Sequence, residues 1–328
     1  MIISIFKKDY FMQFVLLILV TILLWLPAFI NPVAPIINPK LDMPIYNAIV
    51  YALTSSSLLS VFIAFLLVVG QAFLLNYVFT NYKLTRKTSY LPAFIYIILM
   101  SSDYRVMTMS SLLLANTFII LCLFSFLKCY NKNEGLDEIY LSTLLLSVAA
   151  LIYAPFILLM IWVWVGLFNF KIYKWRSFFV SLFGFLSPFI ILMVYYYLTD
   201  KSDLILSFLS DHYTILPDFT FLNQPIQIVY IVYLLIFLGI PAFFKAMTLR
   251  TDQKLSVRKR VSTLLLYFAI SILPFLYDMN MPTMSLIFAP VLAYMLSLFF
   301  STMKRSLYAD TFLIILLVLT VIKIFVNC

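Results

Sequence analysis

Residues 139–176 read IYLSTLLLSVAALIYAPFILLMIWVWVGLFNFKIYKWR, a long uncharged stretch followed by a basic turn. As one helix, 139–170 would be more than about 45 Å long at 1.5 Å per residue, whereas the hydrocarbon core of a bilayer is about 30 Å thick. Pro155 is unfavourable inside a helix. The stretch therefore predicts two short crossings hinged at Tyr153-Ala154-Pro155, which return the basic KIYKWR to the side where the stretch began.

The rest of the chain has the same character. Hydrophobic residues make up 65% of the 328 residues and charged residues 11%, which excludes a water-soluble domain. Apolar segments of about 20 residues recur from end to end. We predict an all-α fold, a polytopic transmembrane helical bundle of about eleven spans that forms a single integral membrane domain over 1–328. Besides the two arms of 139–170, the predicted spans are 11–30, 58–80, 90–101, 106–127, 177–198, 226–244, 261–277, 284–301 and 311–327.

Lysine and arginine orient this bundle, because basic loop residues stay on the cytoplasmic side of a membrane. Alternate gaps between the apolar segments hold 18 of the 22 basic residues. The N-terminus is then cytoplasmic and the C-terminus external, as in a multi-pass protein of the cell inner membrane. The predicted partner is the lipid bilayer, to whose anionic headgroups these bases anchor the loops. Their dispersal over six segments argues against nucleic-acid binding.

Several segments carry finer expectations. Segment 90–101 is short for a full crossing, and 45–57 is amphipathic enough to lie on the external surface. Gln71, Asn76 and Asn116 are expected to form hydrogen bonds between helices. Glycine is scarce, so we expect few close helix crossings. Lys323, in the last span, is expected to snorkel toward the membrane surface.

Candidate catalytic residues lie in the external gaps, where the acids concentrate. Asp42 lies in the first external loop, which contains Pro32, Pro35, Pro39 and Pro44, directly before the predicted surface helix. A carboxylate held there can deprotonate an acceptor hydroxyl or hold a cation. The alternative for Asp42 is a solvated loop acid.

Asp103, Arg105 and His212 are the candidate substrate-binding residues. Arg105 is one of four external bases, and its guanidinium suits bidentate binding of phosphate; the alternative is a local ion pair with Asp103 that caps the next span. His212, the only histidine, lies in the longest external loop, 199–225, before the C-terminal spans of 226–328. It is either a phosphate partner or an exposed loop residue. We predict no metal and no cofactor, because the chain has one histidine and no phosphate loop or dinucleotide turn.

The order of segments resembles the C-type glycosyltransferase (GT-C) superfold over about residues 1–200. The resemblance rests on KLDMPIYNAIVYAL (40–53), on SLLLANTFIILCLFSFL (111–127) and on LSTLLLSVAALIYAPFILLMIWVWVGL (141–167) with the basic KIYKWR after it. It places Asp42 where that superfold has an acid in its first external loop. The chain departs from the superfold in lacking paired acids in that loop and a large external C-terminal domain. The opening MIISIFKKD and the length resemble a family of polytopic inner-membrane proteins of Bacteroidetes type, which implies a location and no reaction.

Three functions follow as hypotheses. The first is a GT-C-like glycosyltransferase that uses a polyprenyl-phosphate-linked sugar at the external face, with Asp42 as base. The second is a non-catalytic membrane component that assists an envelope secretion or assembly machine. A transporter ranks third, because the sequence shows no internal repeat.

Overall fold

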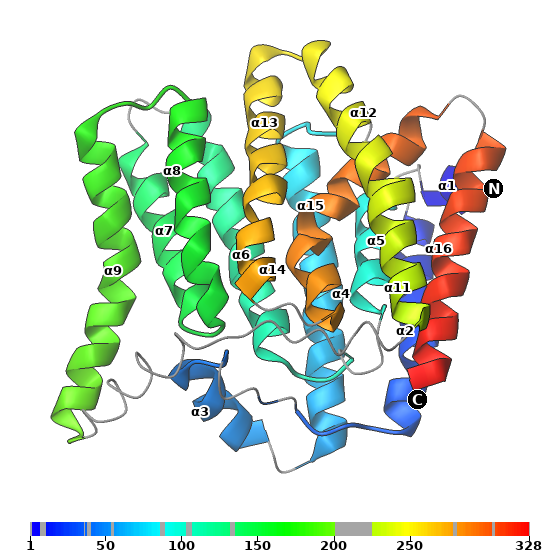
Figure 1. Cartoon of the computed structure of the whole chain (residues 1–328), viewed down its shortest axis with the longest axis horizontal. Helices are drawn as coiled ribbons and strands as arrows, with labels where there is room; N and C mark the ends of the chain where they lie inside the picture. The colour runs from blue at the N-terminus through cyan, green and yellow to red at the C-terminus, as the bar shows by residue number, and fades with distance from the viewer. Residues whose placement is uncertain are drawn as a thin grey trace.

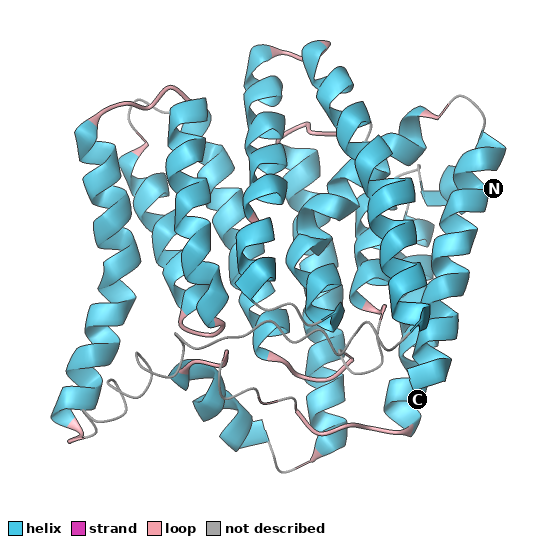
Figure 2. Cartoon of the chain, viewed as in Figure 1, coloured by secondary structure: helices cyan, strands magenta, loops and turns pink. Residues whose placement is uncertain are grey.

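The computed structural model is built of helices joined by loops (Figures 1 and 2). It describes residues 2–6, 11–35, 37, 41–53, 56–85, 89–102, 107–131, 135–200, 225–277, 281–303 and 306–327. The helices are α1 (Ile2–Phe6), α2 (Phe11–Ile30), α3 (Pro44–Leu53), α4 (Ser57–Asn81), α5 (Leu91–Met100), α6 (Ser111–Lys128), η2 (Cys129–Asn131), α7 (Leu136–Ala150), η3 (Ala154–Leu159), α8 (Met160–Asn169), α9 (Trp175–Leu198), α11 (Pro225–Val232), η5 (Tyr233–Gly239), α12 (Ile240–Thr251), α13 (Leu255–Ile270), α14 (Ile272–Tyr277), α15 (Met281–Thr302) and α16 (Ser306–Asn327).

The prediction of a polytopic helical membrane protein is confirmed. Seven helical segments of the described residues are long and apolar enough to cross a membrane: Phe11–Ile30, Ser57–Asn81, Ser111–Lys128, Trp175–Leu198, Ile228–Thr251, Leu255–Leu276 and Leu307–Phe325. Shorter apolar helices cover Leu91–Met100, Ala154–Asn169 and Leu286–Thr302. Large apolar side chains such as Phe183 and Ile191 are exposed on the outside of the bundle, as expected of helices that face lipid. A count of eleven spans requires the shorter helices and α7 to cross as well.

Helix α5 explains how so short an apolar segment fits the bundle. Its ten residues are all buried, and it packs between α4 and α15. A helix of ten residues is only about 15 Å long, so α5 by itself covers about half of the hydrocarbon core. Protein surrounds α5, so its ends contact other helices and not lipid. Helix ends at membrane depth are tolerated where they are buried in protein in this way.

The hinge predicted within 139–170 is confirmed. Helix α7 ends at Ala150, η3 begins at Ala154, and α8 runs back beside α7 (Figure 1). Between them Asp42 and Tyr153 form an antiparallel bridge. The predicted surface helix is also present: α3 lies outside the end of the bundle, below the turn between α7 and η3 in Figure 1.

The expectation of few close helix crossings is wrong for α7 and α9. A Cβ atom on Gly184 would contact the Thr143 hydroxyl and would lie 2.8 Å from the Tyr140 carbonyl oxygen. Ser177 and Ser181, on the same face of α9, are fully buried. Small residues let helix backbones approach each other closely. In α9 two serines and one glycine provide this close contact, so a low glycine content does not exclude it.

The basic turns gather at one end of the bundle. The turns at 170–174 and 251–254 lie at the top of Figure 1, whereas 31–35, α3 and the turn at 151–153 lie at the bottom. The fold thus separates the segments that the charge pattern assigns to opposite sides of the membrane. Which end faces the cytoplasm stays a prediction.

Candidate functional site

Buried charged side chains are candidate functional groups, because burying a charge costs free energy unless the charge is paired or coordinates a metal. Within the described residues these are Asp42, Glu138, Arg260, Asp310 and Lys323. Asp42 and Lys323 lie toward the predicted external end, and the other three toward the end with the basic turns.

Asp42 is held by backbone pairing with the hinge. The Ala154 N–H donates to the Leu41 carbonyl at 3.0 Å, and the Met43 N–H donates to the Ile152 carbonyl at 3.3 Å. Pro44 then starts α3, a helix position that proline favours. Asp42 itself is 1% exposed. The alternative of a solvated loop acid is therefore wrong.

Two buried tyrosines accompany Asp42. Tyr46, one helical turn further along, is fully buried, and its hydroxyl donates to the Met109 carbonyl at 3.0 Å. Burial, and secondarily the Asp42 carboxylate, raise the pKa of the Tyr46 phenol far above its usual value. Tyr46 therefore stays protonated and remains a donor at physiological pH. Tyr153, the bridge partner of Asp42, is 1% exposed and packs edge-on against Phe156.

Hydrogen bonds fasten the neighbouring loops at the same end. Thr108 donates to the Val33 carbonyl at 3.0 Å and lies 2.9 Å from the Ser60 hydroxyl oxygen. The Trp25 indole donates to the Ser101 hydroxyl at 2.9 Å. The first loop and α3 are thus joined to the hinge through Leu41 and Met43, and to the segment at 107–110 through Val33 and Tyr46. We call this junction the Asp42 site.

Three predicted site residues remain. Asp103, Arg105 and His212 lie outside the described residues, so their proximity to Asp42 stays a prediction. Met109, which accepts the Tyr46 hydrogen bond, is close in sequence to Arg105.

Lys323 corrects another expectation. Instead of snorkelling, it is 1% exposed, and its ammonium lies 4.8 Å from the centre of the Tyr230 ring in α11. Helical spacing was the signal that sequence reasoning missed, since Lys323 follows Leu313, Leu316 and Thr320 along the buried stripe of α16. A buried lysine in a membrane span is a candidate functional group by itself.

Arg260 shows that the basic residues do not all anchor loops to lipid. Its guanidinium lies 4.6 Å from the centre of the Tyr82 ring and 5.8 Å from that of Tyr130, and its Nε donates to the Leu127 carbonyl at 3.0 Å. Burial raises the pKa of Tyr82 to about 12, against the opposing effect of the Arg260 charge. Arg260 thereby joins α13 to the ends of α4 and α6.

Gln71 and Asn116 form the predicted hydrogen bonds between helices, whereas the Asn76 side-chain oxygen is buried without a hydrogen-bond partner among the described residues. Gln71 donates to the Leu113 carbonyl at 2.8 Å and to the Thr117 hydroxyl at 2.7 Å, and it accepts from Tyr96 at 2.7 Å. Asn116 donates to the Leu286 carbonyl at 2.9 Å. These hydrogen bonds connect α4, α5, α6 and α15 and serve the packing.

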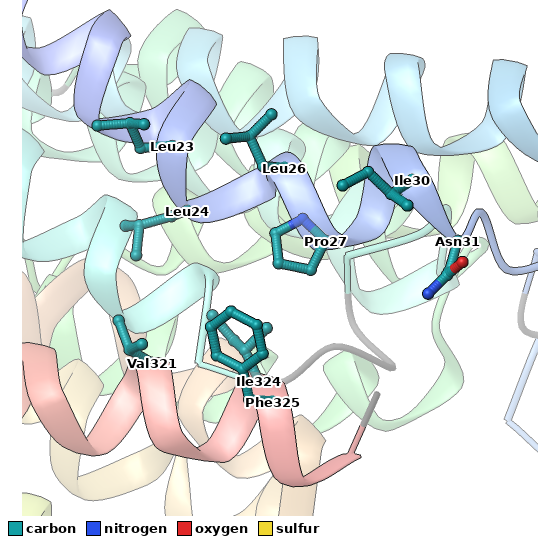
Figure 3. A pocket seen from close by; sticks show the side chains of 9 residues that line it. All are labelled: Leu23, Leu24, Leu26, Pro27, Ile30, Asn31, Val321, Ile324 and Phe325. Carbon is teal, nitrogen blue, oxygen red and sulfur yellow. The ribbon is translucent and has the colours of Figure 1, made fainter.

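A groove of about 540 Å³ runs between α2 and α16. Figure 3 shows the side chains that line it, with Asn31 at one end. They are Leu23, Leu24, Leu26, Pro27, Ile30, Asn31, Val321, Ile324 and Phe325. The groove can hold hydrocarbon, but its lining offers no group for acid–base chemistry.

Metal ligands are not clustered in the part of the chain that the structure describes, where no group of three His, Cys, Asp or Glu residues is suited to hold an ion. Comparisons with protein-family models, curated proteins and solved structures found no match to this chain.

Proposed function

We propose that this chain is a multi-pass inner-membrane protein that transfers a sugar from a polyprenyl-phosphate-linked donor at the external face. In this proposal all eleven apolar segments cross or enter the membrane, with the N-terminus cytoplasmic and the C-terminus external. The carrying observation is the burial of Asp42 at the junction of the first loop and the hinge. The resemblance to the GT-C superfold also favours Asp42 as the catalytic acidic residue of the first external loop.

Asp42 would act as general base. The acceptor hydroxyl oxygen attacks the anomeric carbon, the bond from that carbon to the phosphate oxygen breaks, and the polyprenyl phosphate leaves with the electron pair. The hydroxyl proton passes to the Asp42 carboxylate. Rigid placement favours this role, because a base must be held within hydrogen-bond reach of its proton, and the two backbone hydrogen bonds hold Leu41–Met43 against the hinge.

The proposed substrate-binding residues lie outside the described part of the chain. Arg105 would bind the donor phosphate with Asp103 beside it, and His212 would be a second phosphate partner. A guanidinium binds phosphate with two parallel hydrogen bonds, whereas a lysine offers a point charge. Arg105→Lys is therefore expected to weaken donor binding.

Lipid-linked glycan profiling tests the proposal. A strain that lacks the protein is complemented with the wild type, Asp42→Asn or Asp200→Asn. Asp200 is a matched control, since it is another predicted external acid, located at the end of α9. We expect the donor pool to accumulate in the deletion and Asp42→Asn strains and to return to normal with Asp200→Asn. The proposal fails if Asp42→Asn restores the wild-type profile at equal protein abundance.

The second candidate, a non-catalytic membrane component, also has an observation in its favour. Asp42 is 1% exposed and lies within a backbone bridge, which suits a structural junction as well as a site. This function predicts that Asp42→Asn lowers thermal stability, leaves lipid-linked sugars unchanged, and leaves stoichiometric partners bound during purification. The two measurements together separate the candidates.

A further inference from the structure

Four basic residues lie where α8, α12 and α13 meet at the end of the bundle with the basic turns. Lys171 follows α8, Arg250 lies in the last turn of α12, and Arg258 and Lys259 lie near the start of α13. Helices α8 and α12 both pack against α13. We call these four residues the basic cluster.

The backbone fixes Lys171 in place. It has a left-handed conformation, with φ of 63°, and the following Ile172 N–H donates back to the Leu167 carbonyl at 3.0 Å. This pairing closes the end of α8 in the way that glycine usually does. Lys171 therefore extends from a defined turn and not from a loop of arbitrary path.

Hydrogen bonds hold the members from α12 and α13. The Lys259 ammonium donates to the Asn169 carbonyl at 2.7 Å, and the Asn169 amide donates back to the Lys259 carbonyl at 2.9 Å. Arg250 donates through Nη1 to the Ser262 hydroxyl at 3.0 Å. Its Nε is buried without a hydrogen-bond partner among the described residues.

The other members of the cluster repel the Lys259 ammonium. The charges that act on the Lys259 ammonium are those of Lys171, Arg258 and Arg250, and each repels it. Holding like charges together by hydrogen bonds is unfavourable unless an anion occupies the space between them.

We infer that the basic cluster is a binding site for a phosphate group. A phosphate has the charge and the acceptor oxygens to bind several of these donors at once. Two exposed aromatic side chains follow Lys171, namely Tyr173 and Trp175. Tyrosine and tryptophan favour the level of lipid headgroups, so the phosphate of an anionic phospholipid in the adjacent leaflet is the expected source.

Native mass spectrometry of the purified full chain in detergent tests this site. The protein is titrated with phosphatidylglycerol, with phosphatidylcholine and with inorganic pyrophosphate. The site variant carries Lys171→Asn and Arg258→Gln, both at exposed positions. The control variant carries Lys128→Gln and Lys254→Gln, which remove the same charge from exposed positions at the same end of the bundle.

The site variant is expected to lose about fivefold in phosphatidylglycerol affinity per base removed, on the order of 25-fold in total, since a base that donates to the bound phosphate contributes a hydrogen bond of about 1 kcal/mol. The control variant should stay within about fivefold of the wild type, which corresponds to one base at most. Arg258→Gln alone gives the same comparison if the double variant unfolds.

The other outcomes are equally decisive. Equal losses in the site and control variants would mean diffuse attraction and would overturn the site. Binding of neither phosphatidylglycerol nor pyrophosphate above the level of phosphatidylcholine would also overturn it. A third outcome is that the wild type binds pyrophosphate, the site variant does not, and phosphatidylglycerol binds no better than phosphatidylcholine. That outcome would uphold a phosphate site and identify a soluble compound as the source.

Discussion

Gly184→Ala is expected to destabilise the protein, although alanine favours helices over glycine. The added Cβ would contact the Thr143 hydroxyl and lie 2.8 Å from the Tyr140 carbonyl oxygen. The Thr143 hydroxyl is itself bound to the Ile139 and Tyr140 carbonyls at 3.0 Å each, so it cannot turn away without losing those bonds. Helix α9 must therefore shift away from α7.

The magnitude follows from two opposing effects. Overpacking a filled contact costs about 1–3 kcal/mol, and replacing glycine with alanine inside a helix returns up to about 1 kcal/mol. We expect a net loss of about 1 kcal/mol for Gly184→Ala and a larger loss for Gly184→Leu. Gly70→Ala is the matched control, because nothing lies within 4 Å of a Cβ at Gly70 in the middle of α4. It should gain about 1 kcal/mol.

Thermal unfolding followed by tryptophan fluorescence measures both variants, in one detergent and at one heating rate, since irreversible unfolding makes the midpoint depend on the rate. The expected result is a lower midpoint for Gly184→Ala and an unchanged or higher one for Gly70→Ala. A Gly184→Ala variant that is stabilised as much as Gly70→Ala would refute the close packing of α7 on α9.

Three further changes test other contacts by the same assay. Gln71→Leu removes the hydrogen bonds to Leu113, Thr117 and Tyr96 and should cost about 1–2 kcal/mol, more than Tyr96→Phe, which removes one of them. Arg260→Lys loses the planar group that stacks on Tyr82 and should cost about 1 kcal/mol, whereas Arg258→Lys, at an exposed position, should have no effect. Lys323→Met should keep the packing of α16 and the unfolding midpoint but fail to restore the wild-type lipid-linked glycan profile, which would identify Lys323 as a functional residue. Equal effects of each variant and its control, or a Lys323→Met protein that is active and equally stable, would contradict these assignments.

Much of the fold was predictable because lipid imposes simple length and charge rules. The apolar runs identified the helical segments, and Pro155 identified the hinge between α7 and η3. The amphipathic segment after Pro44 is the separate helix α3. Each of these predictions depends on local sequence, because the thickness of the bilayer limits the length of an apolar helix to about 20 residues.

Contacts between distant segments were not predictable in this way. Nothing in the sequence indicates that Asp42 pairs with Tyr153, because the pairing depends on how the first loop folds over the bundle. The burial of Arg260 and Lys323 was missed for a related reason. Charge alone suggested surface positions, and the helical spacing that places both on buried stripes becomes informative only once the neighbouring helices are known.

The proposed function depends on the sidedness of the bundle, which a labelling experiment measures directly. Val33→Cys and Lys174→Cys place reactive thiols at exposed positions, in the segments 31–35 and 170–174 at opposite ends of the bundle. The background carries Cys328→Ser, and Cys122 and Cys129 are buried. A membrane-impermeant maleimide is applied to spheroplasts before and after permeabilisation. We expect Val33→Cys to react in intact spheroplasts and Lys174→Cys to react only after permeabilisation. The reverse pattern would place Asp42 in the cytoplasm and contradict sugar transfer at the external face.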